Sequence, residues 1–326
     1  MNSWGDKFRV TIWGESHGKQ VGVSIDGVPA GIALQEEDFL QDLSRRKAGG
    51  VGTTTRTESD YPHIVSGIYE GHTTGAPLTI VFENENTRSG DYRNLVAHPR
   101  PSHADWVAQR KWNGYNDPRG GGHFSGRLSL GLVAAGVIAK KILGQSSIFS
   151  TRITEIGGEQ DSQKFEVIIE QARMAQDSIG GVVECRVCGM EAGLGEPFFD
   201  SAESLISHLL FSVPAVKGVE FGDGFASAQK RGSQYNDMII DSEGHTATNH
   251  AGGIVGGITN GNEIVVRAAI KPTASISQEQ ATFNFEHGQI EPLIIKGRHD
   301  VCIALRAAVV VEAATAIALA ELKLRA

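Results

Sequence analysis

Histidine, arginine and serine stand beside glycine in four separate stretches of this sequence. The stretches are residues 14–18 (GESHG), 119–127 (RGGGHFSGR), 249–253 (NHAGG) and 297–300 (GRHD). Glycine lets backbone N–H groups approach an anion closely, arginine grips carboxylate or phosphate with a planar fork, and histidine moves protons near neutral pH. One such stretch would be weak evidence, because glycine turns are common. Four of them indicate a site for a ligand with several negative charges whose reaction needs proton transfer.

A fifth candidate stretch is residues 100–105 (RPSHAD). His103 stands just before an expected helix, where the positive end of the dipole favours a neutral imidazole. It could act as a base or a tuned proton donor, or it could stand incidentally beside a helix cap. His17 follows the end of an expected strand, where ligand-binding loops often begin. Asp300 precedes the last expected helix and could also be its N-cap.

Three further patterns are less specific. The basic run 44–47 (SRRK) could line an anion pocket or could complement the dipole at a helix end. Neither a G-x-G-x-x-G nor a G-x-x-x-x-G-K-[ST] motif occurs, so a nucleotide would not be held by a standard Rossmann loop or P-loop. Cys185 and Cys188 form a C-x-x-C pair without a partner pair, inside a strand-like stretch, and we assign no metal site.

The elements that must position these residues mix strands and helices without a strict βαβ order. Alternating apolar residues predict strands at 8–13, 21–25, 63–69, 78–83, 148–156, 182–190, around 219, 264–270 and 290–295. Helical spacing predicts helices at 34–46, 128–143, 165–176, 201–211 and 301–324. The mixture predicts an α+β fold. Because we find no linker and no convincing repeat, we expect one compact unit over residues 1–326.

The composition excludes several classes of protein. Glycine accounts for 40 of 326 residues, where ordinary usage is roughly 7%, and this argues against an all-helical bundle. A formal net charge of -8 argues against general nucleic-acid binding. Three cysteines suggest reduced thiols and a cytoplasmic setting, and the N-terminus lacks the apolar core of a signal peptide. The most apolar stretch, 301–324, is interrupted by Arg306 and Glu312 and predicts a buried helix, not a membrane span.

Taken in order along the chain, these motifs closely resemble one family, the chorismate synthases. The resemblance runs from residue 8 to about residue 322. In the first half it is carried by 8–10 (FRV), 14–18 (GESHG), 26–29 (DGVP), 45–46 (RR), 66–67 (SG), 70–71 (EG), 73–75 (TTG), 100–105 (RPSHAD) and 119–122 (RGGG). In the second half it is carried by 193–197 (GLGEP), 216–220 (VKGVE), 222–225 (GDGF), 249–253 (NHAGG), 271–273 (KPT) and 297–300 (GRHD).

The resemblance implies a lyase at the last step of the shikimate pathway, in aromatic amino acid biosynthesis. Such enzymes eliminate phosphate in a trans-1,4 sense from 5-enolpyruvylshikimate 3-phosphate and so form chorismate. They are flavoproteins that need reduced FMN, although the reaction has no net redox change. The implied fold is a β-α-β layered sandwich with helices between antiparallel sheets, and members usually form homotetramers. Some also carry an NADPH-dependent flavin reductase activity. We expect this chain to be monofunctional and to depend on an external flavin reductase.

The resemblance also assigns roles to individual residues. His17 is the expected proton donor to the leaving phosphate, His103 the expected support for reduced flavin near N1, and Asp300 the expected assistant in proton removal through flavin N5. The expected substrate contacts are Arg45, Arg46, Arg56, Arg119 and Arg127. The expected FMN contacts are His123, Phe124, Ser125, Pro214, Ala215, Gly256, Lys271, Pro272, Thr273, Ala274, Ser275 and Arg298.

The sequence departs from the family pattern near these contacts. Many members read RSSAR after the triple glycine, whereas residues 123–127 here read HFSGR. Pro214 stands where many members have Asn. The loop 49–55 is one residue shorter than in relatives that carry another Arg there, and Arg56 could replace that contact. We interpret these changes as a subfamily variant that retains activity.

Two rival functions remain to be tested. The first is another enzyme acting on a phosphorylated ligand, such as a lyase or phosphatase without flavin. The second is a non-catalytic binding protein that keeps the fold, although the presence of His17, His103 and Asp300 argues against it.

Overall fold

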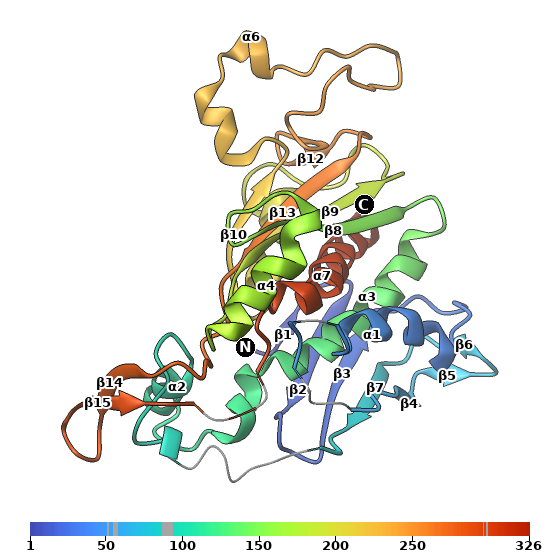
Figure 1. Cartoon of the computed structure of the whole chain (residues 1–326). Coiled ribbons are helices and arrows are strands. Elements are labelled where there is room, and N and C mark those ends of the chain that lie inside the picture. Colours follow the sequence, from blue (N-terminus) through green and yellow to red (C-terminus); the bar gives the residue numbers. More distant parts are fainter. Residues whose placement is uncertain (51, 55–57, 87–93, 296, 298) are drawn as a thin grey trace.

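Two antiparallel sheets enclose a layer of helices (Figure 1). The structure, a computed structural model, describes residues 1–50, 52–54, 58–86, 94–295, 297 and 299–326. One sheet has five strands in the order β1-β2-β3-β7-β4, and the other has four in the order β10-β13-β9-β8. The α+β fold and its β-α-β layers, which the sequence predicted, are therefore confirmed.

The strands of the two sheets come from separate parts of the chain. The five-stranded sheet contains β1 (Ser3–Trp4), β2 (Arg9–Gly14), β3 (Gln20–Asp26), β4 (His63–Ser66) and β7 (Leu78–Glu83). The four-stranded sheet contains β8 (Ile148–Ile156), β9 (Gly181–Cys188), β10 (Val216–Phe221) and β13 (Ile264–Ile270). Three hairpins are formed by β5 (Ile68–Tyr69) with β6 (His72–Thr73), β11 (Ile254–Val255) with β12 (Ile258–Thr259), and β14 (Gln280–Asn284) with β15 (Gln289–Leu293).

The middle layer is built on two long apolar helices, α3 (Ser129–Leu143) and α7 (Ala304–Arg325). Helix α3 packs on β3, and α7 packs on β8 and β9, so each helix covers one sheet. The two helices approach closely, because a Cβ on Gly136 would lie only 2.5 Å from the Cβ of Ala313. The remaining helices are α1 (Leu40–Arg46), α2 (Asp105–Lys111), α4 (Phe165–Met174), α5 (Ala202–Ser212) and α6 (Gly232–Tyr235).

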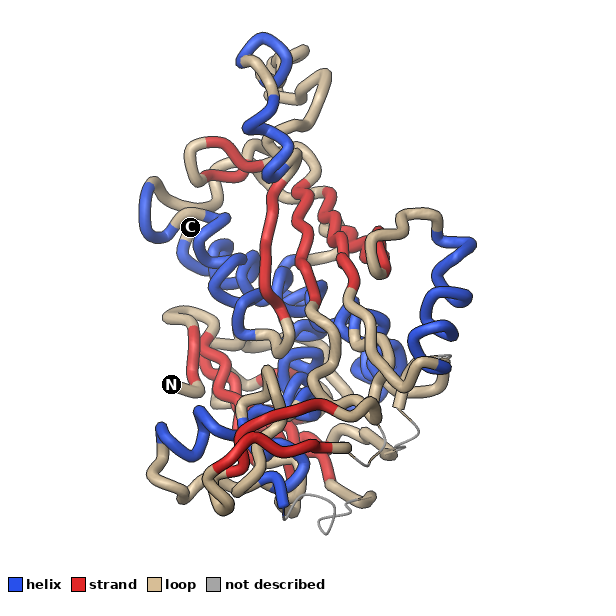
Figure 2. Tube along the Cα trace, turned by 60° about the vertical axis from the view of Figure 1, so that its left-hand side comes forward, coloured by secondary structure: helices blue, strands red, loops and turns tan. Residues whose placement is uncertain are grey.

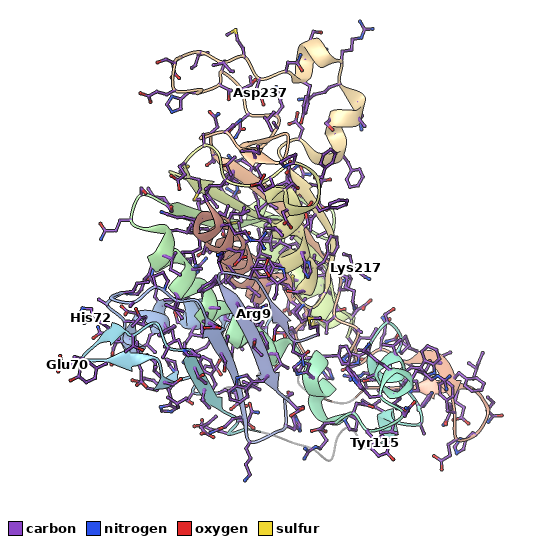
Figure 3. The ribbon with its side chains drawn as sticks, turned by 180° about the vertical axis from the view of Figure 1, so that it is seen from behind. Arg9, Glu70, His72, Tyr115, Lys217 and Asp237 are labelled. Atoms are coloured by element: carbon purple, nitrogen blue, oxygen red, sulfur yellow. The ribbon has the colours of Figure 1, made fainter. Side chains whose placement is uncertain are left out.

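One segment leaves the layered body altogether. Residues 224–250, which include α6, rise beyond the end of the four-stranded sheet in both Figure 1 and Figure 2. Asp237 marks this projecting segment in Figure 3, on the opposite end of the molecule from Tyr115. In the part of the chain that the structure describes, no helix is long and apolar enough to cross a membrane.

Most elements were predicted well, and the exceptions have local causes. The helix expected from residue 34 begins as a short 3₁₀ helix, Glu36–Phe39, where the Asp38 carboxylate accepts a hydrogen bond from the Gln35 N–H at 2.9 Å. The α-helix itself begins only at Leu40. The strand expected over 63–69 is broken at Gly67, whose φ of 88° is incompatible with an extended strand. Strand β14 was not predicted.

A buried carboxylate connects the helices of the middle layer. Glu312 of α7 accepts two hydrogen bonds of 2.7 Å from the Arg45 guanidinium of α1, and a third from Lys140 of α3. Burial alone would raise the pKa of Glu312, but the bonds and charges of Arg45 and Lys140 lower it to about 2. Glu312 is only 3% exposed, so its charge depends on these partners.

Replacing Glu312 with Gln should destabilise the protein at neutral pH. The change leaves two cations without their buried partner, and we expect a loss of about 3 kcal/mol in the free energy of unfolding. Because the folded pKa lies below the unfolded value of roughly 4.3, the stabilisation is complete above that value and is lost as the pH falls towards 2. Urea unfolding of wild type and E312Q at pH 7 and pH 3 measures this difference.

The matched control is Glu170→Gln, which breaks an exposed ion pair with Arg173 on α4 and should leave the free energy of unfolding unchanged. If the free energies of unfolding of wild type and E312Q differed by the same amount at pH 7 and at pH 3, the proposed role of the Glu312 charge would be contradicted.

Candidate active site

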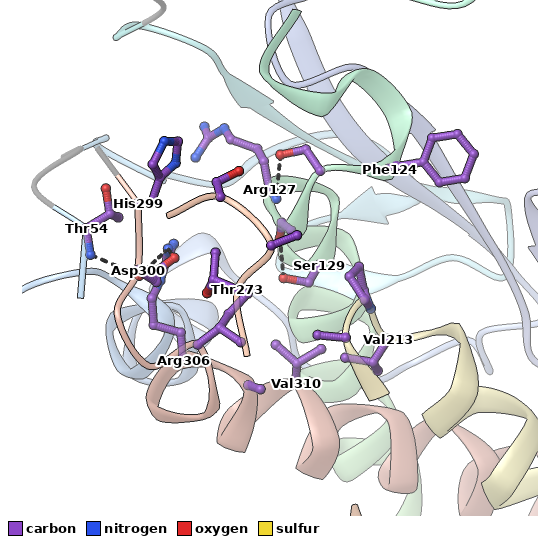
Figure 4. A pocket seen from close by; sticks show the side chains of 18 of the residues that line it. Thr54, Phe124, Arg127, Ser129, Val213, Thr273, His299, Asp300, Arg306 and Val310 are labelled. Carbon is purple, nitrogen blue, oxygen red and sulfur yellow. Dashed lines mark hydrogen bonds and ion pairs between the residues drawn. The ribbon is translucent and has the colours of Figure 1, made fainter. Parts of the chain in front are cut away.

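A cavity of about 500 Å³ opens where loops of the two sheets meet the start of α7. Figure 4 shows how side chains from distant segments point into it. Its walls come from residues around 46–48, 54, 58–60, 100–104, 120–129, 213–215, 271–275 and 299–310. The predicted site residues that line it are Arg46, His103, Phe124, Ser125, Arg127, Pro214, Ala215, Lys271, Pro272, Thr273, Ala274, Ser275 and Asp300.

Three successive glycines bring two predicted catalytic histidines to this region. Gly120, Gly121 and Gly122 have φ values of 60°, 81° and 54°, which side-chain-bearing residues rarely adopt. A Cβ on Gly120 would lie 2.6 Å from the Nε2 atom of His17, and a Cβ on Gly121 would lie 3.6 Å from the Nε2 atom of His103. His17 is 8% exposed and lies behind Gly120, which itself lines the cavity.

A cluster of arginines forms the basic side of the cavity. Arg127 donates a hydrogen bond of 2.5 Å to Asp60, and Arg46 donates hydrogen bonds to the Ser129 hydroxyl and the Gly126 carbonyl. The Nη1 atom of Arg46 makes no hydrogen bond to any residue that the structure describes and lies 3.7 Å from the Asp60 carboxylate. Burial and the nearby charge of Arg306 lower the pKa of Arg46 to about 9. An anion bound beside Arg46 would therefore be strongly favoured.

Asp300 is held in place from two directions. Its carboxylate accepts hydrogen bonds of 2.9 Å from the backbone N–H of Thr54 and from the Arg306 guanidinium. Helix α7 begins at Ala304 with Ile303 as its N-cap, so Asp300 is not the helix cap. The sequence did not single out Arg306 as a site residue. Its only signal was that it interrupts an apolar stretch.

A loop after β13 forms the opposite wall. Residues 271–275 all line the cavity, and the backbone N–H of Lys271 donates a hydrogen bond of 2.9 Å to the carbonyl of Ala215. Ala215 adopts a φ of 75°, an uncommon value for a residue with a side chain. Burial and the charge of Lys217 lower the pKa of Lys271. Beside this loop, Val213, Ala307 and Val310 give the cavity an apolar side.

Several predicted residues lie outside the cavity. Arg45 is engaged by Glu312 and Asp42, and Arg119 pairs with Asp117. His123 lies 2.7 Å from the Gly14 carbonyl, and Gly256 lies in the β11–β12 turn. Arg56 and Arg298 fall outside the residues that the structure describes. The roles that the sequence predicted for all of these residues stay predictions.

His123 and Phe124, the two residues after the triple glycine that depart from the family pattern, lie in different surroundings. His123 bonds to the backbone of the N-terminal sheet, whereas Phe124 lines the cavity and its ring centroid lies 5.4 Å from that of Trp112. The departure from the family pattern therefore places an aromatic ring at the cavity edge. In the C-x-x-C pair, Cys185 is buried and Cys188 is exposed, so the two thiols lie on opposite faces of β9.

The sequence profile of the chorismate synthases matches residues 8–324. The chain belongs to the chorismate synthase family. It is 59% identical to the chorismate synthase of Chitinophaga pinensis, over 99% of this chain and 97% of the relative. It is 42% identical to that of Korarchaeum cryptofilum, over 98% and 96% of the two chains. A crystal structure of a chorismate synthase superposes with a TM-score of 0.75 at 26% identity, covering 99% of this chain and 93% of that one.

Membership fixes the general chemistry. Chorismate synthases are carbon–oxygen lyases that catalyse the final step of the shikimate pathway. Among the described residues, arginine, histidine and carboxylate side chains line the cavity described above. We therefore take this cavity as the candidate active site.

Replacing Gly120 with Ala should disable the site without unfolding the protein. The new Cβ would lie 2.5 Å from the Cδ2 atom of His17, so the imidazole must move. We expect turnover to fall more than tenfold, measured as chorismate formation under anaerobic conditions. The control is Gly158→Ala, at a similar φ of 88° but with no atom within 4 Å of the new Cβ. Equal activity of G120A and G158A would show that the position of His17 does not matter.

Proposed function

We propose that this chain converts 5-enolpyruvylshikimate 3-phosphate to chorismate by trans-1,4 elimination of phosphate, with reduced FMN bound in the cavity. The observation that carries the proposal is the mixed character of that single cavity. It joins an arginine cluster and two histidine-bearing segments with an apolar wall. A substrate with one phosphate and two carboxylates requires the cations, and a flat flavin ring requires the apolar wall.

The cavity has groups suited to reduced FMN. Residues 271–275 offer backbone and side-chain donors, and the Thr273 hydroxyl is buried without a hydrogen-bond partner in the described part of the chain. Such an orphaned group is satisfied when a ligand supplies the missing partner. Ser125, Ala215 and the loop Lys271–Ser275 would hold the cofactor, while Val310 and Ala307 would contact its ring. When bound, reduced FMN supplies transient electron density to the substrate.

The arginine cluster suits the substrate anions. Arg46 is 3% exposed and has lost its hydration. The single carboxylate of Asp60 faces both Arg46 and Arg127, so it offsets their two positive charges only in part. A phosphate or carboxylate would complete this charge balance. We therefore assign substrate binding to Arg46 and Arg127. The contributions predicted for Arg45 and Arg119 are not required by this geometry, and Arg56 lies outside the described residues.

We assign the proton transfers and their support to three side chains. We assign proton donation to the leaving phosphate to His17, which does not itself line the cavity but packs against Gly120, which does. We assign His103 to the polar edge of the flavin and Asp300 to assistance in removing the substrate proton. The two hydrogen bonds from Thr54 and Arg306 keep the Asp300 carboxylate oriented. Each acid–base contribution of this kind is typically worth about 10²- to 10⁴-fold in rate.

We further propose that the protein is a cytoplasmic homotetramer that receives reduced flavin from a separate reductase and not from an NADPH-dependent activity of its own. The projecting segment 224–250 supports the assembly. It exposes large apolar side chains, among them Phe225, Met238 and Ile239, which are 65–79% exposed. Exposed apolar side chains gathered on one segment favour contact with another chain.

An anaerobic assay separates the proposed function from its rivals. The purified protein is mixed with 5-enolpyruvylshikimate 3-phosphate, with and without reduced FMN, and chorismate and phosphate are measured separately. We expect equal amounts of both products, formed only with reduced FMN. Phosphate release at the same rate without flavin would instead support a flavin-independent lyase or phosphatase. Binding without any product in a single turnover would support a non-catalytic protein.

A further inference from the structure

His103 is hydrogen-bonded to the carboxylate of Asp105, a residue that has no part in the expected mechanism. Its Nδ1 atom lies 2.7 Å from the Oδ1 atom of Asp105 and 3.0 Å from the Nη2 atom of Arg100. A guanidinium can only donate, and an ionised carboxylate can only accept. The shorter contact therefore places a proton on Nδ1, directed at Asp105. This leaves Nε2 as the ring nitrogen that His103 can offer to a ligand.

Asp105 is itself fixed by Arg100. The Arg100 guanidinium donates two hydrogen bonds of 2.7 Å to the two oxygens of Asp105, in a bidentate pair. The backbone N–H of Arg100 donates a further bond of 3.1 Å to the same carboxylate. Both side chains are buried, at 6% and 9% exposure. Burial would raise the pKa of Asp105, but the bonds from Arg100 and His103 hold it well below its usual range.

The same arginine reaches the opposite wall of the cavity. Its Nη1 atom donates a hydrogen bond of 2.9 Å to the hydroxyl of Ser275, which is 6% exposed. Ser275 ends the loop Lys271–Ser275, so the chain His103–Asp105–Arg100–Ser275 joins two walls that are 175 residues apart in sequence. The backbone at Ser102, next to His103, has a φ of 58°, and the surrounding bonds hold this uncommon conformation.

We propose that Asp105 and Arg100 are positioning residues that fix the proton of His103 on Nδ1, present its Nε2 atom to the cavity, and tie this histidine to the loop ending at Ser275. The inference rests on the proposed function, because it gives the role of His103 in that function a physical basis. A carboxylate bonded to one imidazole nitrogen sets both the tautomer and the ring orientation. Asp105 acts through His103 and not on the substrate.

A double-mutant cycle tests this dependence. The variants are His103→Ala, Asp105→Asn and their combination, assayed anaerobically with saturating reduced FMN. We expect D105N to lower kcat at least tenfold and to change the KM for the substrate less than threefold. If Asp105 acts only through His103, the double variant should be no more than twofold slower than H103A alone. If Asp105 instead had a purely structural role, the fold-loss in kcat of the double variant would be the product of the losses in the two single variants.

Two further variants guard the interpretation. Asp241→Asn removes an equivalent carboxylate, 2.7 Å from His245 in the projecting segment, and should leave kcat unchanged. D105N leaves Arg100 buried without its partner and could unfold the protein. The variant Arg100→Gln combined with Asp105→Asn removes both charges and keeps a test possible. We expect it to be folded by circular dichroism and to show the same loss of kcat.

The outcomes distinguish failure of the inference from failure of the proposed function. Wild-type turnover by H103A would show that His103 has no role, and the inference would fall with the proposed role. Slow H103A together with wild-type D105N, or with losses that multiply in the double variant, would overturn the inference alone.

Discussion

The site depends on three successive backbone residues that only glycine readily provides. Gly120, Gly121 and Gly122 all turn in the left-handed sense, and each would cost roughly 1 kcal/mol or more with another residue. The missing side chain of Gly120 leaves room for the imidazole of His17, and a Cβ on Gly122 would lie only 2.0 Å from the Asp117 carbonyl oxygen. The carbonyl of Gly122 also accepts a hydrogen bond of 3.1 Å from the N–H of Ser16, so the turn and the His17 loop are fixed together. The high glycine content thus has a specific use at this turn.

Carboxylates offset the positive charge of the arginines at the cavity before a ligand binds. Asp60 lies between Arg46 and Arg127, Asp300 pairs with Arg306, and Asp105 pairs with Arg100. Without them, clustered buried cations would repel one another. The offset is incomplete at Arg46, whose Nη1 atom makes no hydrogen bond within the described part of the chain. The fold therefore holds a site that is basic enough to attract anions yet stable without them.

The sequence predicted the architecture better than the detailed site. Strands β7 and β8 and helix α3 were found within a residue, because apolar periodicity directly reflects which face is buried. The sequence could not predict that Arg46 lines the cavity while Arg45 pairs with Glu312. Adjacent helical residues point about 100° apart, and only tertiary packing decides which of them faces the cavity. Arg306 and Asp60 were missed for the same reason. Their importance comes from partners far away in the sequence.

We expect one cavity to hold flavin and substrate together, between the triple-glycine turn and the loop Lys271–Ser275. A crystal structure of the protein with oxidised FMN and 5-enolpyruvylshikimate 3-phosphate measures this directly. We expect the flavin ring to lie against Val310 and Ala307, with His103 at its polar edge and the substrate phosphate within reach of His17 and Arg46. Density for flavin or substrate outside this cavity, with the cavity filled only by water, would show that the two ligands bind elsewhere.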